Sequence, residues 1–148
     1  MTTVRKLLES KGDASNYSVS STDMVIQALK LMTDAHIGTV LVTENKRIIG
    51  IFTERDYVNK GELEGRRAES TPVKDVMTGS MYTVTMDTSM EQCMALMEMH
   101  RIRHLPVVEN DRLVGLVSIR DVMVEALKNK ESEIKGLENY IISSGFAG

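Results

Sequence analysis

The chain has 148 residues, of which 42% are hydrophobic and 26% are charged, a composition that argues against wholesale disorder. Its formal net charge is −3 and it has no long basic run, so we expect no nucleic-acid partner. Cys93 is the single cysteine, which excludes an internal disulfide framework. Because no secretory signal pattern and no apolar run of roughly 18 residues is present, we expect a cytoplasmic protein without membrane association.

The predicted elements begin with a short helix at Val4 to Ser10 and an extended segment at Tyr17 to Ser20. Thr22 or Asp23 then offers an N-cap oxygen for a longer helix. That helix carries apolar residues at helical spacing, namely Val25, Ala28, Leu29 and Met32.

Two β-rich runs follow, Thr39 to Thr43 and Ile48 to Phe52. The polar tetrapeptide Glu44 to Arg47 between them predicts a hairpin turn. A further helix is expected from Thr53, which completes a β-α-β-β-α unit.

The second half has the same order of elements. Its segments are an extended run at Tyr82 to Thr85, an N-cap at Asp87 or Thr88, a helix with Met90, Met94 and Met97, two strands at Leu105 to Val108 and Leu113 to Val117, a turn at Glu109 to Arg112, and a helix from Ser118.

The two halves are one sequence written twice at an offset of 65. Ile37 to Asp56 aligns with Ile102 to Asp121 without a gap, and Ile, Val, Glu, Asn, Arg, Gly, Arg and Asp coincide. The same register reaches back to Tyr17 and Tyr82. We therefore expect two copies of one structure, and because one copy alone cannot bury its apolar face, we expect them to pack together.

The segments outside the repeats are polar or helical. Gly61 to Thr71 indicates a linker, Pro72 a short helical turn that ends near Met77-Thr78, and Ser132 to Ile142 a C-terminal helix with apolar Ile134, Leu137, Ile141 and Ile142. The expected boundaries are 1–16 for an N-terminal helical segment, 17–60 for the first repeat, 61–76 for the linker, 77–130 for the second repeat, and 131–148 for the C-terminal helix and tail.

The pattern Gly-x-x-[Thr/Ser]-x-Arg-Asp occurs in both halves where a strand passes into a helix. Its members are Gly50, Thr53, Arg55 and Asp56, then Gly115, Ser118, Arg120 and Asp121. An aspartate can accept two hydrogen bonds from a ribose diol, a hydroxyl at a helix start suits phosphate, and arginine adds a charged donor. The same hydroxyl and carboxylate also fit a capping box that only satisfies helix-end N–H groups, and both interpretations stay open.

The whole pattern resembles a tandem pair of cystathionine-β-synthase (CBS) domains. The resemblance rests on Ile102 to Val108, on Leu113 to Asp121, on Met77-Thr78 and on Thr53 to Tyr57, and it covers the chain from about Tyr17 to Leu127. It implies an α/β (α+β) fold, a CBS-domain pair of two β-α-β-β-α repeats with pseudo-two-fold symmetry, also called a Bateman module.

The resemblance also implies an adenosyl ligand in clefts between the halves: AMP, ADP, ATP or NAD(H), in preference to S-adenosylmethionine, with no metal required. The expected ribose and phosphate contacts are Asp56, Asp121, Thr53, Ser118, Arg55, Arg120, Arg103 and His104. The expected adenine walls are Ser18, Val19, Ile37, Gly38, Thr39, Val40, Tyr82, Thr83, Val84, Leu105 and Pro106.

The two halves differ at the expected phosphate contact. Where the second half has Arg103-His104-Leu105-Pro106, the first has Gly38-Thr39-Val40-Leu41, which lacks the basic pair and the proline. We therefore expect the two clefts to bind phosphate unequally.

No catalytic constellation is present, and the resemblance implies a regulatory sensor that forms a homodimer and signals to a separate, unidentified protein. The alternative is a structural or oligomerisation module with a degenerate ligand site. We interpret His100 and His104 as separate residues across a helix-to-strand break, Cys93 as a buried thiol, and the methionines from Met86 to Met99 as core. The charges from Lys128 to Glu133 indicate a solvated helix face.

Overall fold

The computed structural model describes residues 2–11 and 17–143, with side chains to Asn139. Residues 1, 12–16 and 144–148 of the predicted terminal segments, and the side chains of Ile141 and Ile142, lie outside the described part. The first repeat contains β1 (Ser18–Ser20), α2 (Val25–Ala35), β2 (Thr39–Glu44), β3 (Arg47–Thr53) and α3 (Glu54–Asp56), and a π-helical turn (Tyr57–Gly61) continues α3. β1 is parallel to β2, which is antiparallel to β3, so the predicted order is confirmed.

The second repeat contains α4 (Met90–His100), β4 (His104–Glu109), β5 (Arg112–Ser118) and α5 (Ile119–Ser143). The extended run predicted at Tyr82 to Thr85 forms only an isolated parallel bridge from Val84 to Val107. Val84 N–H donates to the Pro106 carbonyl at 3.0 Å, and Val108 N–H donates to the Val84 carbonyl at 2.9 Å. The next bond of this ladder would need an N–H at Pro106, which proline lacks, so the strand stops there.

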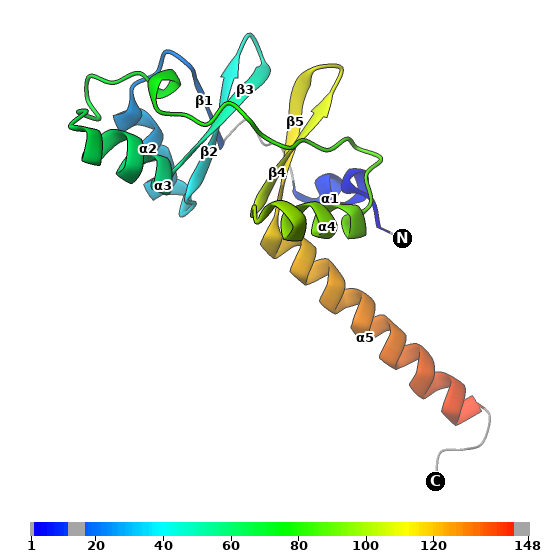
Figure 1. Ribbon diagram of the computed structural model, residues 1–148. Helices are drawn as coiled ribbons and strands as arrows, with labels where there is room; N and C mark the ends of the chain where they lie inside the picture. Colours follow the sequence, from blue (N-terminus) through cyan, green and yellow to red (C-terminus); the bar gives the residue numbers. More distant parts are fainter. Residues whose placement is uncertain (1, 12–16, 144–148) are drawn as a thin grey trace.

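Both predicted hairpin turns are confirmed. Asn45 and Lys46 have φ of 53° and 67°, and Asn110 and Asp111 have φ of 52° and 62°. Two successive left-handed residues are the geometry that closes a two-residue hairpin, and Asn and Asp tolerate it better than most residues. Figure 1 shows the two hairpins side by side.

The predicted N-caps of the two long helices are wrong by one or two positions. The N-cap residues are Met24 for α2 and Ser89 for α4. Asp23 and Thr88 instead accept hydrogen bonds from the N–H groups of Ser20 and Thr85, at 2.9 and 3.1 Å. Their oxygens close the preceding turn and so are used before the helix begins.

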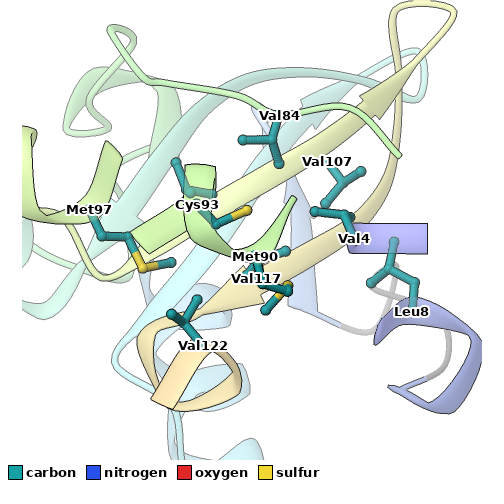
Figure 2. Close-up of a cluster of buried hydrophobic side chains, with 10 residues drawn as sticks. Val4, Leu8, Val84, Met90, Cys93, Met97, Val107, Val117 and Val122 are labelled. Carbon is teal, nitrogen blue, oxygen red and sulfur yellow. The ribbon is translucent and has the colours of Figure 1, made fainter. Parts of the chain in front are cut away.

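Each repeat has its own hydrophobic core. The first contains Val19, Val25, Ala28, Met32, Val40, Val42, Phe52, Val73 and Val76. The second contains Val4, Leu8, Val84, Met90, Cys93, Met97, Leu105, Val107, Val117 and Val122 (Figure 2). Leu41 and Leu116 form a third cluster with Ile48, Ile51 and Leu113, which packs the two repeats together as expected.

The helix α4 divides its methionines between core and surface. Met90 and Met97 are buried, but Met94 and Met99 are 42% and 73% exposed, so the prediction that the whole run is core is wrong. Cys93 is fully buried, which confirms the predicted buried thiol, and burial raises the pKa of this thiol to about 11.

The predicted linker is an ordered strap on the first repeat. The linker strap (Thr71–Met77) donates from Val73 N–H to the Asp23 carbonyl, and the N-terminal strap (Thr2–Leu8) donates from Val4 N–H to the Thr88 carbonyl, at 2.8 and 2.9 Å. The two straps thus correspond at an offset of 69. The linker strap packs on the first repeat, which precedes it, and the N-terminal strap packs on the second repeat. Figure 1 accordingly shows α1 (Val4–Lys11) beside the second repeat. The N-terminal segment, predicted as a separate unit, is therefore part of the second core.

The helix α5 runs unbroken from Ile119 to Ser143, so the helix predicted at Ser132 to Ile142 is not separate but continues the helix predicted from Ser118. Residues 128–139 are all exposed, as expected for the charges from Lys128 to Glu133, and α5 projects away from the body in Figure 1. No helix in the described part of the chain is both long and apolar enough to cross a membrane.

Candidate functional site

Both repeated hydroxyl–carboxylate pairs form capping boxes. Thr53 Oγ1 accepts from Asp56 N–H at 3.1 Å, and Asp56 Oδ2 accepts from Thr53 N–H at 3.1 Å. Ser118 and Asp121 repeat the arrangement at 3.1 and 2.8 Å. The capping interpretation is therefore confirmed, and each box engages only one of the two carboxylate oxygens.

The repeated glycines make room for the straps. A Cβ at Gly50 would lie 2.6 Å from Met77 Sδ, and a Cβ at Gly115 would lie 2.5 Å from Leu8 Cδ1. Met77 and Leu8 correspond at the strap offset of 69. Packing against the straps thus explains the glycine of the motif.

The carboxylate of the first repeat is engaged on both oxygens. Asp56 Oδ1 accepts from the Thr78 hydroxyl at 3.0 Å and lies 3.4 Å from Lys60 Nζ. Lys60 Nζ also donates to Thr78 Oγ1 at 3.1 Å, and the Asp56 side chain is 12% exposed. A ligand would have to break this network to reach Asp56.

The carboxylate of the second repeat is engaged on one oxygen. Lys11 Nζ donates to Asp121 Oδ2 at 2.5 Å and to the Leu116 carbonyl at 2.8 Å. Within the described residues, Oδ1 of Asp121 accepts no hydrogen bond. The position equivalent to Lys60 is Glu125, which accepts from the Thr2 hydroxyl at 2.6 Å, so the cation comes from α1 instead.

Burial and charge shape the titration of this second site. Burial acts to raise the pKa of Asp121, but hydrogen bonds from Lys11 and Ser118 outweigh it and hold the pKa below its usual range. Burial lowers the pKa of His104; the charges of Lys11 and Arg103 add to this, whereas Asp121 opposes it. At neutral pH the site therefore combines a carboxylate, two cations and a neutral imidazole.

The structure brings the predicted basic pair to the cap of the second repeat. His104 pairs with Ser118 across the hairpin, and Ile119 N–H donates to the Arg103 carbonyl at 2.8 Å. In the first repeat Thr39 pairs with Thr53 in the same way, and Glu54 N–H donates to the Gly38 carbonyl at 3.1 Å. The pair that precedes the cap is therefore basic in the second repeat and uncharged, Gly38-Thr39, in the first.

Several predicted wall residues cannot offer a side chain to a ligand. Val19, Val40, Val84 and Leu105 belong to the two cores, and Thr39 and Pro106 are also buried. The predicted walls combine backbone and side chains, and at these six positions the backbone alone could contact a ligand. Ser18, Ile37 and Gly38 are half-buried, and the exposed members of the predicted site are Arg55, Arg120, Arg103, Tyr82 and Thr83.

Tyr82 stacks on His100, with ring centroids 3.6 Å apart and 12° between the planes. Because α4 ends at His100 and β4 begins at His104, the predicted break between the two histidines is confirmed. The described residues include no group of three or more His, Cys, Asp or Glu that could hold a metal ion.

Two clefts were compared with the predicted site residues. One of about 450 Å³ lies between α1 and α5 and is lined in part by Arg120 and Asp121. A larger one of about 910 Å³ lies between the hairpin ends, lined in part by Arg47 and Arg112, and includes none of the predicted site residues. Only the second repeat's aspartate therefore lines one of these two clefts.

Sequence reasoning missed three partners of the aspartates. Lys60 lies four residues after Asp56, a helical spacing that could have indicated it. Thr78 and Lys11 are 22 and 110 residues from the aspartates they contact, and no local pattern marks them.

Comparisons with known proteins agree with this architecture. The CBS domain family model matches residues 14–61 and 73–128. CBS domain-containing protein CBSX3, mitochondrial, of Arabidopsis thaliana is 36% identical over 148 residues, covering 95% of this chain and 72% of that protein. A solved CBS-domain protein of Burkholderia ambifaria is 40% identical with a TM-score of 0.78, covering 86% of this chain and 95% of its own.

The fold is also shared by CBSX2, whose crystal structure is a complex with AMP. It is 24% identical with a TM-score of 0.73, covering 88% of this chain and 99% of its own. The chain therefore belongs to the CBS-domain family, as a tandem CBS-domain pair. This conclusion rests on the two matched family segments, on the repeat at an offset of 65 and on these similar proteins.

Proposed function

We propose that this protein is a non-catalytic regulatory module that binds an adenosyl ligand and signals to a separate protein. The observation that carries the proposal is the second capping box, where Asp121 Oδ1 accepts no hydrogen bond from the described residues and lies beside Ser118 and a basic pair. A carboxylate oxygen accepts hydrogen bonds from a ribose diol, and Arg103 supplies a charged donor for phosphate.

The proposed ligand is AMP, ADP, ATP or NAD(H), in preference to S-adenosylmethionine. The phosphate groups of these nucleotides complement the charge of Arg103, whereas the sulfonium of S-adenosylmethionine would be repelled by it. Because CBSX2 was solved in complex with AMP, AMP is the first ligand to test. The other proposed contacts at this site are Arg120, His104, Tyr82, Thr83 and the backbone of Val84, Leu105 and Pro106.

We propose that the first repeat binds ligand weakly or not at all. Both oxygens of Asp56 are engaged, and Gly38 and Thr39 offer no positive charge for phosphate. The other candidate contacts there are Ser18, Ile37, Thr53, Arg55 and the backbone of Val19 and Val40.

Thermal unfolding with each nucleotide tests this function. A ligand at 100 times its dissociation constant stabilises the folded state by roughly 2.7 kcal/mol, which gives a clear upward shift of Tm. No shift with any of the four nucleotides or S-adenosylmethionine at millimolar concentration would favour the alternative, a structural module whose capping boxes and lysine contacts are purely structural.

We also propose a homodimer in the cytoplasm, although the plant relative CBSX3 is named as mitochondrial. The projecting helix α5 exposes Met123, Leu127, Ile134 and Leu137, which are 54% to 63% exposed and spaced as one helix face. A second copy is the partner proposed for this face. Sedimentation at micromolar concentration should give a dimer, and a stable monomer would contradict this part of the proposal.

A further inference from the structure

The contact between Lys11 and Asp121 joins the N-terminal helix to the proposed ligand site. It spans 110 residues of sequence, and both side chains are partly shielded, at 27% and 19% exposed. Lys11 is the last residue of α1, and Leu8, one turn earlier, is seated on Gly115. The C-terminal end of α1 is therefore tied to the aspartate that the proposed function needs.

The limited number of hydrogen bonds that a carboxylate oxygen can accept makes a ligand compete with Lys11 for Asp121. A carboxylate oxygen has two lone-pair directions, and Asp121 Oδ2 already accepts from Ser118 N–H and from Lys11 Nζ. A ribose diol that donates to both oxygens must displace one of these donors. The Ser118 N–H is fixed in the cap of α5, whereas Lys11 is a flexible side chain that can leave at less cost.

We infer that Lys11 is a ligand-displaceable latch: a diol that binds Asp121 releases Lys11 and loosens the end of α1, so that the N-terminal helix reports occupancy of the second repeat. This inference rests on the proposed function. The first repeat has no such latch, because Lys60 lies on the same helical segment as Asp56 and its release would free no distant element.

The test uses the full chain and two probes, AMP and 2′,3′-dideoxy-AMP, which share base and phosphate but differ in the diol. Hydrogen exchange of residues 5–11 and calorimetric affinity are measured for the wild type, Lys11→Met and the matched control Lys60→Met. We expect AMP to speed exchange in α1 of the wild type by roughly 3- to 10-fold, the worth of one partly exposed charged hydrogen bond, and dideoxy-AMP to leave it unchanged.

Lys11→Met should show the faster exchange without ligand and bind AMP roughly 3- to 10-fold more tightly, since no latch has to be displaced. Lys60→Met should match the wild type in both measurements. If Lys11→Met binds AMP and the wild type does not, this result would also support the latch.

Three results would overturn the latch. If AMP binds but exchange in α1 is unchanged or slower, or if Lys11→Met binds AMP more weakly, the latch is wrong and the proposed function stands. If neither the wild type nor Lys11→Met binds AMP, while calorimetry with ADP, ATP and NAD(H) is equally silent, the proposed function and the latch fail together.

Discussion

The two repeats use the same capping box but differ in what surrounds the second carboxylate oxygen. In the first repeat, Thr78 and Lys60 engage Oδ1 of Asp56. In the second, Oδ1 of Asp121 is unengaged within the described residues, and the cation at Oδ2 comes from Lys11 on a different element. Duplication thus preserved the local helix start, whereas the long-range partners diverged, and those partners decide which aspartate a ligand can reach.

The largest expected stability difference between the repeats lies at the strap-facing glycines. Gly50→Ala should cost about 2–3 kcal/mol, because its Cβ would lie 2.9 Å from the backbone carbonyl of Thr78 as well as against Met77. Gly115→Ala should cost about 1 kcal/mol, because the three atoms nearest its Cβ all belong to the side chain of Leu8 and none to the backbone. Urea unfolding measures both.

The control for this pair is Gly136→Ala. A Cβ at this exposed position in α5 meets nothing within 4 Å, so the change should raise helicity without loss of stability. Equal costs at Gly50 and Gly115 would contradict the difference in strap contacts.

Loss of the cap hydroxyl should reduce stability equally in both repeats. Thr53→Ala and Ser118→Ala each remove a hydroxyl that accepts at 3.1 Å, so each should lower the free energy of unfolding by about 1 kcal/mol. Thr53→Ser and Ser118→Thr keep the acceptor and serve as controls. A near-zero cost at either site would show that its cap is not a stabilising interaction.

A smaller effect is expected where the helices differ in their cores. Cys93 stands where the first repeat has Ala28, so Cys93→Ala makes the second helix resemble the first and should cost at most about 1 kcal/mol. In the wild type, a pKa of about 11 should make the buried thiol unreactive at pH 8 until the chain unfolds. Rapid labelling of the native protein by a thiol reagent would contradict this burial.

The smallest expected effect is a pH dependence that arises from His104 in the second repeat. Because the pKa of His104 is lowered on folding, the unfolded chain binds more protons in that range, and stability rises with pH. The contribution is complete above the ordinary histidine pKa and is lost as pH falls through the lower folded value. Unfolding from pH 5 to 8 should therefore show a slope that His104→Gln reduces, and an unchanged slope would refute this assignment.

The sequence predicted what depends on local pattern. Both hairpins required left-handed residues, and Asn45 and Asn110 stand at those positions. Both caps at Thr53 and Ser118 were visible as spaced hydroxyl and carboxylate pairs. Pro106, by contrast, has no N–H to continue the pairing beyond the bridge from Val84 to Val107, so the second sheet is shorter. The sequence alone does not show this effect, because it depends on the register of the two segments.

Elements that act over long distances were not predictable. The straps correspond at an offset of 69 whereas the repeats correspond at 65, so one alignment could not show both. The straps match each other at Thr2/Thr71 and Val4/Val73, but this match does not tell which repeat each strap packs on. Lys11 went unnoticed for the same reason, although it makes the contact that distinguishes the two aspartates.

The central claim is that the two clefts are unequal and that Asp121 serves the working one. Calorimetric titration of AMP into the wild type, Asp56→Asn and Asp121→Asn tests it directly, because asparagine keeps a side-chain acceptor for the cap. We predict one ligand per chain, retained in Asp56→Asn and weakened at least about 100-fold in Asp121→Asn by the loss of charged hydrogen bonds to the diol. Two equal sites per chain, or unchanged binding by Asp121→Asn, would contradict the account.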